Sequence, residues 1–360
     1  MPFSLEKNRH DDSGVSITRS DRRALPELRE LLILTDHLKG LAHVETLTTV
    51  QHGNIALPQV AIRFGPADVK TPVLALFAGV HGLERIGTRV VISFLRTLIE
   101  FAKWDRNTQD LFSQTRLWLV PLINPLGMFL KHRSNANGVD LMRNAPVDSL
   151  ELKPWQVFGG HRISPSLPWY RGKLGEPMQA EAQAICDFVK REIYPAKTAL
   201  SVDVHSGYGK VDRFWFPYAK TKQPFPSLAQ AVAIKNIFDR TYPNHVYCIE
   251  PQSLQYVTHG DLWDYLYDGY REAQPQGNYI PFCLELGSWL WVKKNWSQMF
   301  SLLGVFNPRL PHRVKRILRR HVFLFDFLSR IVRSPEGWTD LNDGKKERLT
   351  KQGLELWYEP

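Results

Sequence analysis

Apolar runs that alternate with amphipathic segments dominate the middle of the chain. Residues 73–80 and 117–123 are almost continuously apolar, which is typical of buried parallel strands. Between them, apolar residues recur every four positions from Ile86 to Leu98, which predicts a helix with one apolar face. This order of elements favours a sheet whose strands are connected by helices.

The same alternation of strands and helices extends over most of the sequence. We therefore expect an α/β fold, a mixed, largely parallel twisted sheet with helices on both faces. Residues 145–177 are rich in Pro, Gly and Trp and are expected to be irregular. The other expected strands are 44–50, 60–64, 200–204, 246–249 and 280–286, and the other expected helices are 25–38, 178–194 and 312–332.

No break in composition divides the chain into two globular units. The prediction is therefore a single α/β domain, residues 41–335, which would carry any catalytic site. The polar residues 1–40 form an expected N-terminal extension, and residues 336–360 form an expected C-terminal tail.

Composition and charge narrow the choice of partners and compartment. The chain has 46 Lys and Arg against 36 Asp and Glu, a net charge of +10, but the excess is spread out. A solvated basic surface is therefore favoured over a nucleic-acid partner. Three widely spaced cysteines exclude a disulfide scaffold, and no apolar run reaches the roughly 20 residues of a membrane span. Because the N-terminus is charged and has no signal peptide, a cytoplasmic protein is expected.

Three chemically active side chains stand at the carboxyl ends of predicted strands. In an open α/β sheet, binding and catalytic groups lie beyond these ends, so side chains distant in sequence meet there. The three are His81 after strand 73–80, His205 after strand 200–204, and Glu285 near the end of strand 280–286.

The tetrapeptide His81-Gly82-Leu83-Glu84 contains two potential metal ligands. His81 and Glu84 can face one point if the chain turns at Gly82. Imidazole nitrogen and carboxylate oxygen suit zinc, and a catalytic zinc takes three protein ligands and one water. Taken alone, the tetrapeptide is explained more simply by a helix-cap carboxylate beside a core histidine, and a lone His205 is more often structural.

Two further segments carry polar chemistry. Asn124-Pro125-Leu126-Gly127 is followed by a loop, residues 133–144, with two arginines and several amides. The loop has donors that suit a carboxylate or an oxyanion, although a plain surface loop has the same composition. Glu285 lies between leucines in a strand, where a carboxylate is costly to bury without a partner. That partner is either a nearby lysine or a metal site in which Glu285 is catalytic.

Taken in order, these segments resemble the signature of the zinc carboxypeptidase family over about residues 73–287. The family shows His-x-x-Glu, Asn-Pro-x-Gly, Arg…Asn-x-x-Gly-Val-Asp-Leu-Asn-Arg-Asn, a lone His, and Glu-Leu. Each motif is short, but their joint occurrence in order is specific. The resemblance implies the family's α/β fold and a zinc-dependent hydrolase that cleaves an amide bond near a free carboxylate, such as a carboxypeptidase or a small-peptide amidase.

The resemblance also implies a metal site and a general base. One Zn²⁺ ion would be held by His81, Glu84 and His205, and Asp140 would orient the first histidine. Glu285 would act as the general base and acid. The family's mobile tyrosine has four candidates in this chain, which are Tyr256, Tyr265, Tyr267 and Tyr270.

The implied substrate-binding residues depart from the family at one position. Arg133 matches the arginine that polarises the scissile carbonyl, and Arg143, next to Asn144, matches the arginine that binds the terminal carboxylate. The family has Asn where this chain has Met142, so one donor is lost. A lost hydrogen bond to a charged group costs about 1.5–3 kcal/mol, or roughly 10- to 150-fold in binding.

Two other interpretations stay open. A zinc deacylase of the aspartoacylase or succinylglutamate desuccinylase type shares the ligand pattern but cleaves an N-acyl amino acid, and Met142 keeps it open. The second is a non-catalytic protein that binds nucleic acid or a membrane surface through the basic residues 313–321. Because the ligands and Glu285 are intact, we expect neither a nucleic-acid nor a membrane partner, and expect a peptide or an N-acyl amino acid as substrate.

Overall fold

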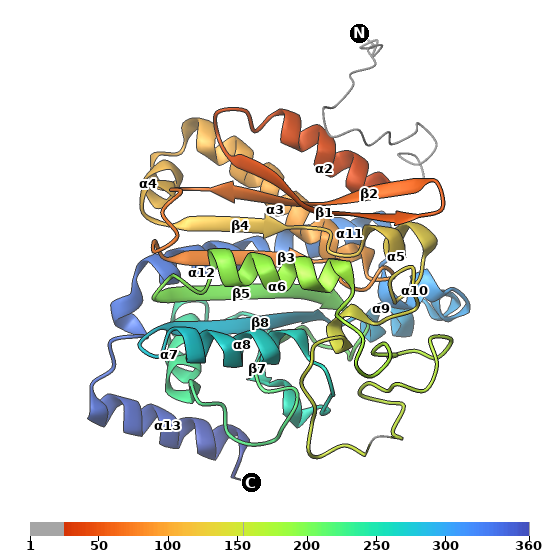
Figure 1. Cartoon of the computed structure of the whole chain (residues 1–360). Coiled ribbons are helices and arrows are strands. Elements are labelled where there is room, and N and C mark those ends of the chain that lie inside the picture. The colour runs from red at the N-terminus through yellow and green to blue at the C-terminus, as the bar shows by residue number, and fades with distance from the viewer. Residues whose placement is uncertain (1–24, 154, 360) are drawn as a thin grey trace.

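An eight-stranded mixed sheet forms the centre of the protein, with helices on both faces (Figure 1). The structure is a computed structural model that describes residues 25–153 and 155–359. The strands lie in the order β1-β2-β4-β3-β5-β8-β6-β7. Their bounds are β1 His43–His52, β2 Ile55–Phe64, β3 Val73–Ala78, β4 Arg116–Val120, β5 Thr198–Ser206, β6 Arg213–Phe216, β7 Cys248–Pro251 and β8 Asn278–Leu286.

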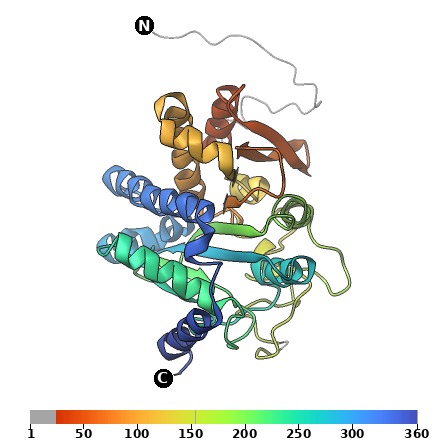
Figure 2. The ribbon, with the colours of Figure 1, turned by 90° about the vertical axis from the view of Figure 1, so that its left-hand side faces the viewer.

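The helices form two layers. Helices α3 and α12 pack on one face of the sheet together with α7 and α13, and α6 and α8 cover the other face (Figure 2). The bounds are α2 Pro26–Asp36, α3 Arg85–Trp104, α4 Arg106–Gln114, α5 Pro125–Leu130, α6 Ala180–Glu192, α7 Leu228–Thr241, α8 Leu262–Ala273, α9 Trp289–Lys294, α10 Leu302–Phe306, α11 Pro311–Arg320, α12 Val322–Arg333 and α13 Asp343–Trp357.

The four central strands β4, β3, β5 and β8 run parallel to one another. The pairs β1–β2, β2–β4 and β6–β8 are antiparallel, and the pair β6–β7 is parallel. The predicted mixed, largely parallel sheet is therefore confirmed. All residues of β3, β4 and β5 are buried, which agrees with the continuous apolar runs, because helices cover both faces of these strands.

Several predicted boundaries need correction. Strand β3 ends at Ala78, so two residues separate it from His81. His205 lies inside β5, one residue before its end, and does not follow the strand. The single helix expected at 312–332 is two helices, α11 and α12, that are separated at His321. His321 is buried, and its Nδ1 atom bonds the hydroxyl of Tyr247 at 2.8 Å.

The hydrophobic pattern does not predict β6, α7, α8 or α13. Helix α13 lies within the expected C-terminal tail and packs on α7, where Asn236 donates to Gln352 at 2.9 Å. Helix α2 lies within the expected N-terminal extension, and its Glu27 pairs with Arg85 of α3. Residues 1–24 of that extension lie outside the described residues, and the division into domain, extension and tail stays a prediction.

Among the described residues, no helix is both long and apolar enough to cross a membrane.

The register of three parallel strands positions the chemically active residues. Val204 of β5 pairs with Ala78 of β3, and His205 pairs with Glu285 of β8. Paired residues of neighbouring parallel strands lie on the same face, about 4.8 Å apart. The sheet therefore places His205 between the end of β3 on one side and Glu285 of β8 on the other.

Helix α3 approaches β5 closely at its first turn. A Cβ atom added to Gly87 would lie 2.4 Å from the carbonyl oxygen of Val204, so only glycine fits without movement. Glu84 is the N-cap residue of the same helix. The position of α3 against β5 therefore fixes Glu84 relative to His205.

We expect Gly87→Ala to lower the free energy of unfolding by about 1–3 kcal/mol, because the added carbon must push α3 away from β5. Urea denaturation of the metal-free protein measures this loss. Gly344→Ala in α13 is the control, because a Cβ atom there meets nothing within 4 Å, and its unfolding midpoint should stay equal or rise slightly. A midpoint of Gly87→Ala equal to that of the wild type would contradict the close packing.

Candidate metal centre

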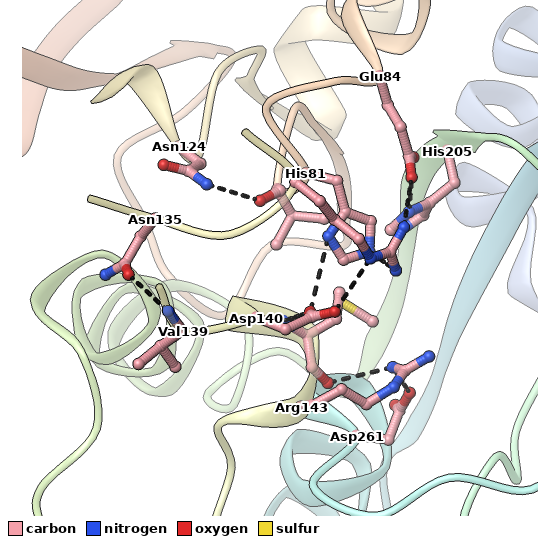
Figure 3. A network of polar contacts seen from close by, with 12 residues as sticks. His81, Glu84, Asn124, Asn135, Val139, Asp140, Arg143, His205 and Asp261 are labelled. Atoms are coloured by element: carbon pink, nitrogen blue, oxygen red, sulfur yellow. Dashed lines mark hydrogen bonds and ion pairs between the residues drawn. The ribbon is translucent and has the colours of Figure 1, made fainter. Parts of the chain in front are cut away.

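Two imidazoles and one carboxylate meet at the carboxyl edge of the central strands (Figure 3). One ligand atom from each of His81, Glu84 and His205 lies within 4.8 Å of the other two, and all three residues are buried. His81 lies after β3, Glu84 is the residue directly before α3, and His205 belongs to β5. The structure thus brings together three side chains that the sequence singled out, and this donor set fits zinc.

The turn that carries His81 is held by the Asn-Pro-x-Gly segment. Asn124 donates from its side chain to the carbonyl of Val80 at 3.1 Å and accepts from the backbone N–H of Gly127 at 2.8 Å. A Cβ atom on Gly82 would lie 2.1 Å from the Gly127 backbone, so the two loops touch there. This motif therefore fixes the path of the ligand loop.

Arg133 donates to three groups at the centre. Its guanidinium contacts Glu84 at 3.2 Å, Asp140 at 3.1 Å and the Nε2 atom of His81 at 2.7 Å. Because a guanidinium only donates, the Nε2 atom of His81 is the acceptor and carries the lone pair, not a proton. The Nδ1 atom of His81 lies 3.6 Å from Asp140. Burial and the charge of Arg133 hold the pKa of His81 well below its usual range, so this imidazole is neutral, as a metal ligand must be.

His205 stands between two carboxylates. Its Nε2 atom lies 2.8 Å from Asp203 and its Nδ1 atom lies 3.1 Å from Glu84. Burial alone would lower the pKa of His205, but Asp203 and Glu84 together raise it well above its usual range. Burial opposes ionisation of Glu84, yet His81 and His205 lower the pKa of its carboxyl group. Positive charge is therefore stabilised where the three ligands meet, as a cation site requires.

Glu285 lies next to this group on β8. Its carboxyl Oε1 atom accepts the backbone N–H of Tyr208 at 2.9 Å. Burial and the negative charge of Glu84 raise the pKa of Glu285 to about 8. The carboxyl group can therefore take up and release a proton close to neutral pH.

The expected substrate-binding residues lie on the neighbouring loop. Arg143 is buried, and its Nη1 atom lies 3.4 Å from Asp261 and 3.3 Å from the carbonyl of Met142 (Figure 3). The Nε atom of Arg143 is buried and has no partner among the described residues. Asn144 donates to the carbonyl of Arg171 at 2.9 Å, and its side-chain oxygen accepts from the loop just before α6. The Asn144 amide is therefore occupied in holding the loop.

The structure distinguishes among the four candidate tyrosines. The hydroxyl of Tyr267 bonds Ser227 at 2.7 Å, and that of Tyr270 bonds the carbonyl of Ala196 at 2.7 Å. Tyr265 lies on the same helix, α8, under Lys190. Burial raises the pKa of the Tyr256 hydroxyl, and the charges of Arg143, Glu285 and Arg133 act on it as well.

Sequence reasoning missed four residues that shape the centre. Three of them contact predicted residues: Asp203 bonds His205, Asp261 bonds Arg143, and the N–H of Tyr208 bonds Glu285. The fourth, Trp263, bonds Asp203. The spacing of Asp203 and His205 was a usable signal, because residues two apart in a strand share a face. Asp261 caps helix α8 and Trp263 lies in its first turn, and the apolar residues of this helix, which recur every four positions, were a second usable signal. Tyr208 lies in the segment after β5, which has no such pattern.

Comparison with known proteins agrees with this arrangement. The sequence profile of the family described as Zinc carboxypeptidase matches residues 37–282. The carboxypeptidase N catalytic chain of Homo sapiens is 22% identical over 208 residues, which are 54% of this chain and 43% of that protein. Carboxypeptidase E of Caenorhabditis elegans is 30% identical over 125 residues, which are 30% of this chain and 26% of that protein. The chain thus spans less than half the length of these curated relatives.

Solved structures of low sequence identity share the fold. Bovine thrombin-activatable fibrinolysis inhibitor, in complex with tick carboxypeptidase inhibitor, has a TM-score of 0.62 at 17% identity, covering 85% of this chain and 96% of that chain. Carboxypeptidase A from Helicoverpa armigera has a TM-score of 0.59 at 17% identity, covering 84% and 71%. Because the profile match spans well over half of the sequence, this chain belongs to the zinc carboxypeptidase family.

Proposed function

We propose that this protein is a zinc-dependent hydrolase that cleaves an amide bond next to a free carboxylate, as a carboxypeptidase or a small-peptide amidase. The main support is the meeting of His81, Glu84 and His205 beside Glu285 at one edge of the sheet. Family membership and the carboxypeptidase names of the relatives support the same activity.

We assign His81, Glu84 and His205 as the ligands of one zinc ion, with Asp140 as the carboxylate nearest to His81. A bound zinc ion would lower the pKa of a water molecule from about 15.7 to about 7 and would polarise the scissile carbonyl. The neutral imidazole of His81 and the ionised carboxylate of Glu84 match the protonation states that a metal requires.

Glu285 is the general base and acid of this mechanism. It takes the proton from the attacking water and passes it to the nitrogen of the leaving amine, so one carboxyl group serves both transfers. In the metal-free protein, burial and the charge of Glu84 raise the pKa of this carboxyl group, so protonation of Glu285 is accessible near neutral pH. The N–H of Tyr208 holds one carboxyl oxygen in place throughout.

Arg133 stabilises the negative charge that develops on the carbonyl oxygen. Its position is fixed by Asp140 and Glu84, and their charges raise its pKa although burial opposes this. A fixed donor of this kind is worth about 2.7–4 kcal/mol in comparable sites. We assign the family's tyrosine to Tyr256, whose hydroxyl is affected by the charges of Arg143, Glu285 and Arg133.

Arg143 binds the free carboxylate of the substrate, with its buried Nε atom as an available donor. Two features weaken this contact. Met142 supplies no donor, and Asp261 already neutralises part of the charge of Arg143. We therefore expect carboxylate recognition that is real but weaker than in a site with both Asn and an uncompensated Arg. Asn144 does not contribute a free amide to it.

The zinc-loaded protein should hydrolyse short peptides with a free C-terminus, and Glu285→Gln should lower kcat by about 10²–10⁴ while zinc stays bound. Glu272→Gln, an exposed glutamate on α8, is the matched control and should leave kcat unchanged. Hydrolysis of N-acyl amino acids but not of peptides would favour the deacylase. Full zinc occupancy without turnover of either class would contradict the proposed function.

Arg143→Ala should lower kcat/KM for peptides with a free C-terminus by about 10- to 150-fold, because a charged hydrogen bond is lost. The same peptides with an amidated C-terminus should lose far less. Arg162→Ala, which removes a half-buried arginine that bonds the carbonyl of Gly172, controls for disturbance of the loop. Equal losses on free and amidated peptides would show that Arg143 is structural.

The raised pKa of Glu285 predicts a pH-dependent stability of the metal-free protein. Between its ordinary pKa of 4.5 and about 8, the folded state holds a proton that the unfolded state releases, so the free energy of unfolding falls as pH rises. Glu285→Gln removes this term, so its stability should fall less over the same range. Urea unfolding at pH 5 and pH 8 measures the difference. Parallel pH dependences of the two proteins would contradict the raised pKa.

A further inference from the structure

A second carboxylate lies behind the candidate metal centre and has no role in the mechanism above. Asp203 belongs to β5, two residues before His205, so the two side chains share one face of the sheet. The Oδ2 atom of Asp203 lies 2.8 Å from the Nε2 atom of His205. Asp203 is 0% exposed, so this contact is dry.

Helix α8 adds a second donor to the same oxygen. The indole Nε1–H of Trp263 donates to the Oδ2 atom of Asp203 at 2.9 Å. The indole ring is buried and packs on Phe77 of β3 with ring centroids 4.8 Å apart, so its direction is fixed by packing. The Oδ2 atom is therefore held from the helix side as well as from the strand.

These two contacts fix which nitrogen of His205 faces Glu84. An indole N–H can only donate, so the oxygen that it meets acts as an acceptor. An acceptor facing the Nε2 atom places a proton on that nitrogen, so Nδ1 is the nitrogen directed toward Glu84, 3.1 Å away. In the metal-free protein a proton between Nδ1 and Glu84 joins this pair, and a bound cation would take the place of that proton. Asp203 thus turns His205 toward the point where Glu84 and His81 also point.

The two imidazoles are supported unequally. Asp140 lies 3.6 Å from the Nδ1 atom of His81 and gives its other oxygen to Arg133. Asp203 is closer to its histidine, and its Oδ1 atom is buried with no partner among the described residues. A buried carboxylate oxygen without a hydrogen bond is costly, so a structural reason alone does not explain this residue.

We infer that Asp203, held by Trp263, is a positioning residue that orients His205 as a metal ligand and strengthens metal binding. This inference rests on the proposed function, because it requires that His205 binds the metal. Carboxylates that bond a ligating imidazole fix its orientation and raise its basicity, and their removal costs about 10- to 100-fold in metal affinity.

The test is the dissociation constant of zinc, measured by competition with a chromophoric chelator on the full-length protein. Asp203→Asn keeps the size and one acceptor oxygen but removes the charge, and it should weaken zinc binding by about 10- to 100-fold. Trp263→Phe keeps the packing on Phe77 and removes only the N–H donor, and it should weaken zinc binding less, in the same direction. This second variant tests the inference if Asp203→Asn does not fold.

Ser201→Ala is the matched control. Ser201 is a buried polar residue of the same strand, two positions before Asp203, and its hydroxyl bonds Tyr279 at 2.8 Å without touching His205. Its removal should lower stability and leave zinc affinity unchanged. In the NMR spectrum of the zinc-loaded wild type, the Nε2–H proton of His205 should be protected from solvent exchange, and this protection should be lost in Asp203→Ala.

The variant His205→Ala distinguishes a failure of the role assigned to Asp203 from a failure of the metal site itself. Zinc affinity that is unchanged in both Asp203→Asn and Trp263→Phe, while His205→Ala loses zinc, would overturn the role of Asp203 alone. Wild-type zinc affinity in His205→Ala would overturn the metal site itself, and with it the proposed function.

Discussion

The register of parallel strands β3, β5 and β8 is the constraint on which the centre depends. Each strand delivers its chemical group at the same edge of the sheet, and His205 pairs directly with Glu285. Because the side-chain period of a strand is two, a slip of one residue would turn His205 and Asp203 to the opposite face. The buried apolar runs that set this register thus also determine whether a metal site exists.

Charge balance is the second requirement of this buried edge. Four buried carboxylates bring negative charge into the interior, namely Glu84, Asp140, Asp203 and Asp261. Ion pairs with Arg133 and Arg143 neutralise part of this charge. Buried charges are tolerated only where they are paired and hydrogen-bonded. The excess of carboxylates around two imidazoles is electrostatically suited to a divalent cation. In the metal-free protein, Asp203 and Glu84 raise the pKa of His205 against the effect of burial, whereas burial, followed by the charge of Glu84, raises the pKa of Glu285.

Local patterns in the sequence correctly predicted part of the structure. The buried strands, the stripe of α3 and the positions of His81, Glu84 and Glu285 near strand ends or a turn all follow from apolar runs and glycine placement. Helix α8 was missed although Leu262, Leu266 and Tyr270 recur every four positions and are buried. Strand β6 has only four residues, which is too short to show an alternating pattern. Helix α13 exposes most of its surface and has no continuous apolar stripe.

Sequence patterns could not predict the hydrogen bonds that join distant residues around the site. The bond from Trp263 to Asp203 joins residues that are 60 positions apart, and the pair of Arg143 and Asp261 joins residues that are 118 apart. No local pattern encodes such distances, because they arise only when α8 packs on the sheet. The choice of Tyr256 among four tyrosines likewise depends on tertiary placement.

The most direct measurement is the anomalous difference density of a zinc-grown crystal, collected on both sides of the zinc absorption edge. We expect one strong peak with a nitrogen atom of His81, a nitrogen atom of His205 and a carboxylate oxygen of Glu84 each about 2.0–2.2 Å away. A fully loaded crystal whose peak lies elsewhere, or whose His205 imidazole points away from the ion, would contradict the metal centre.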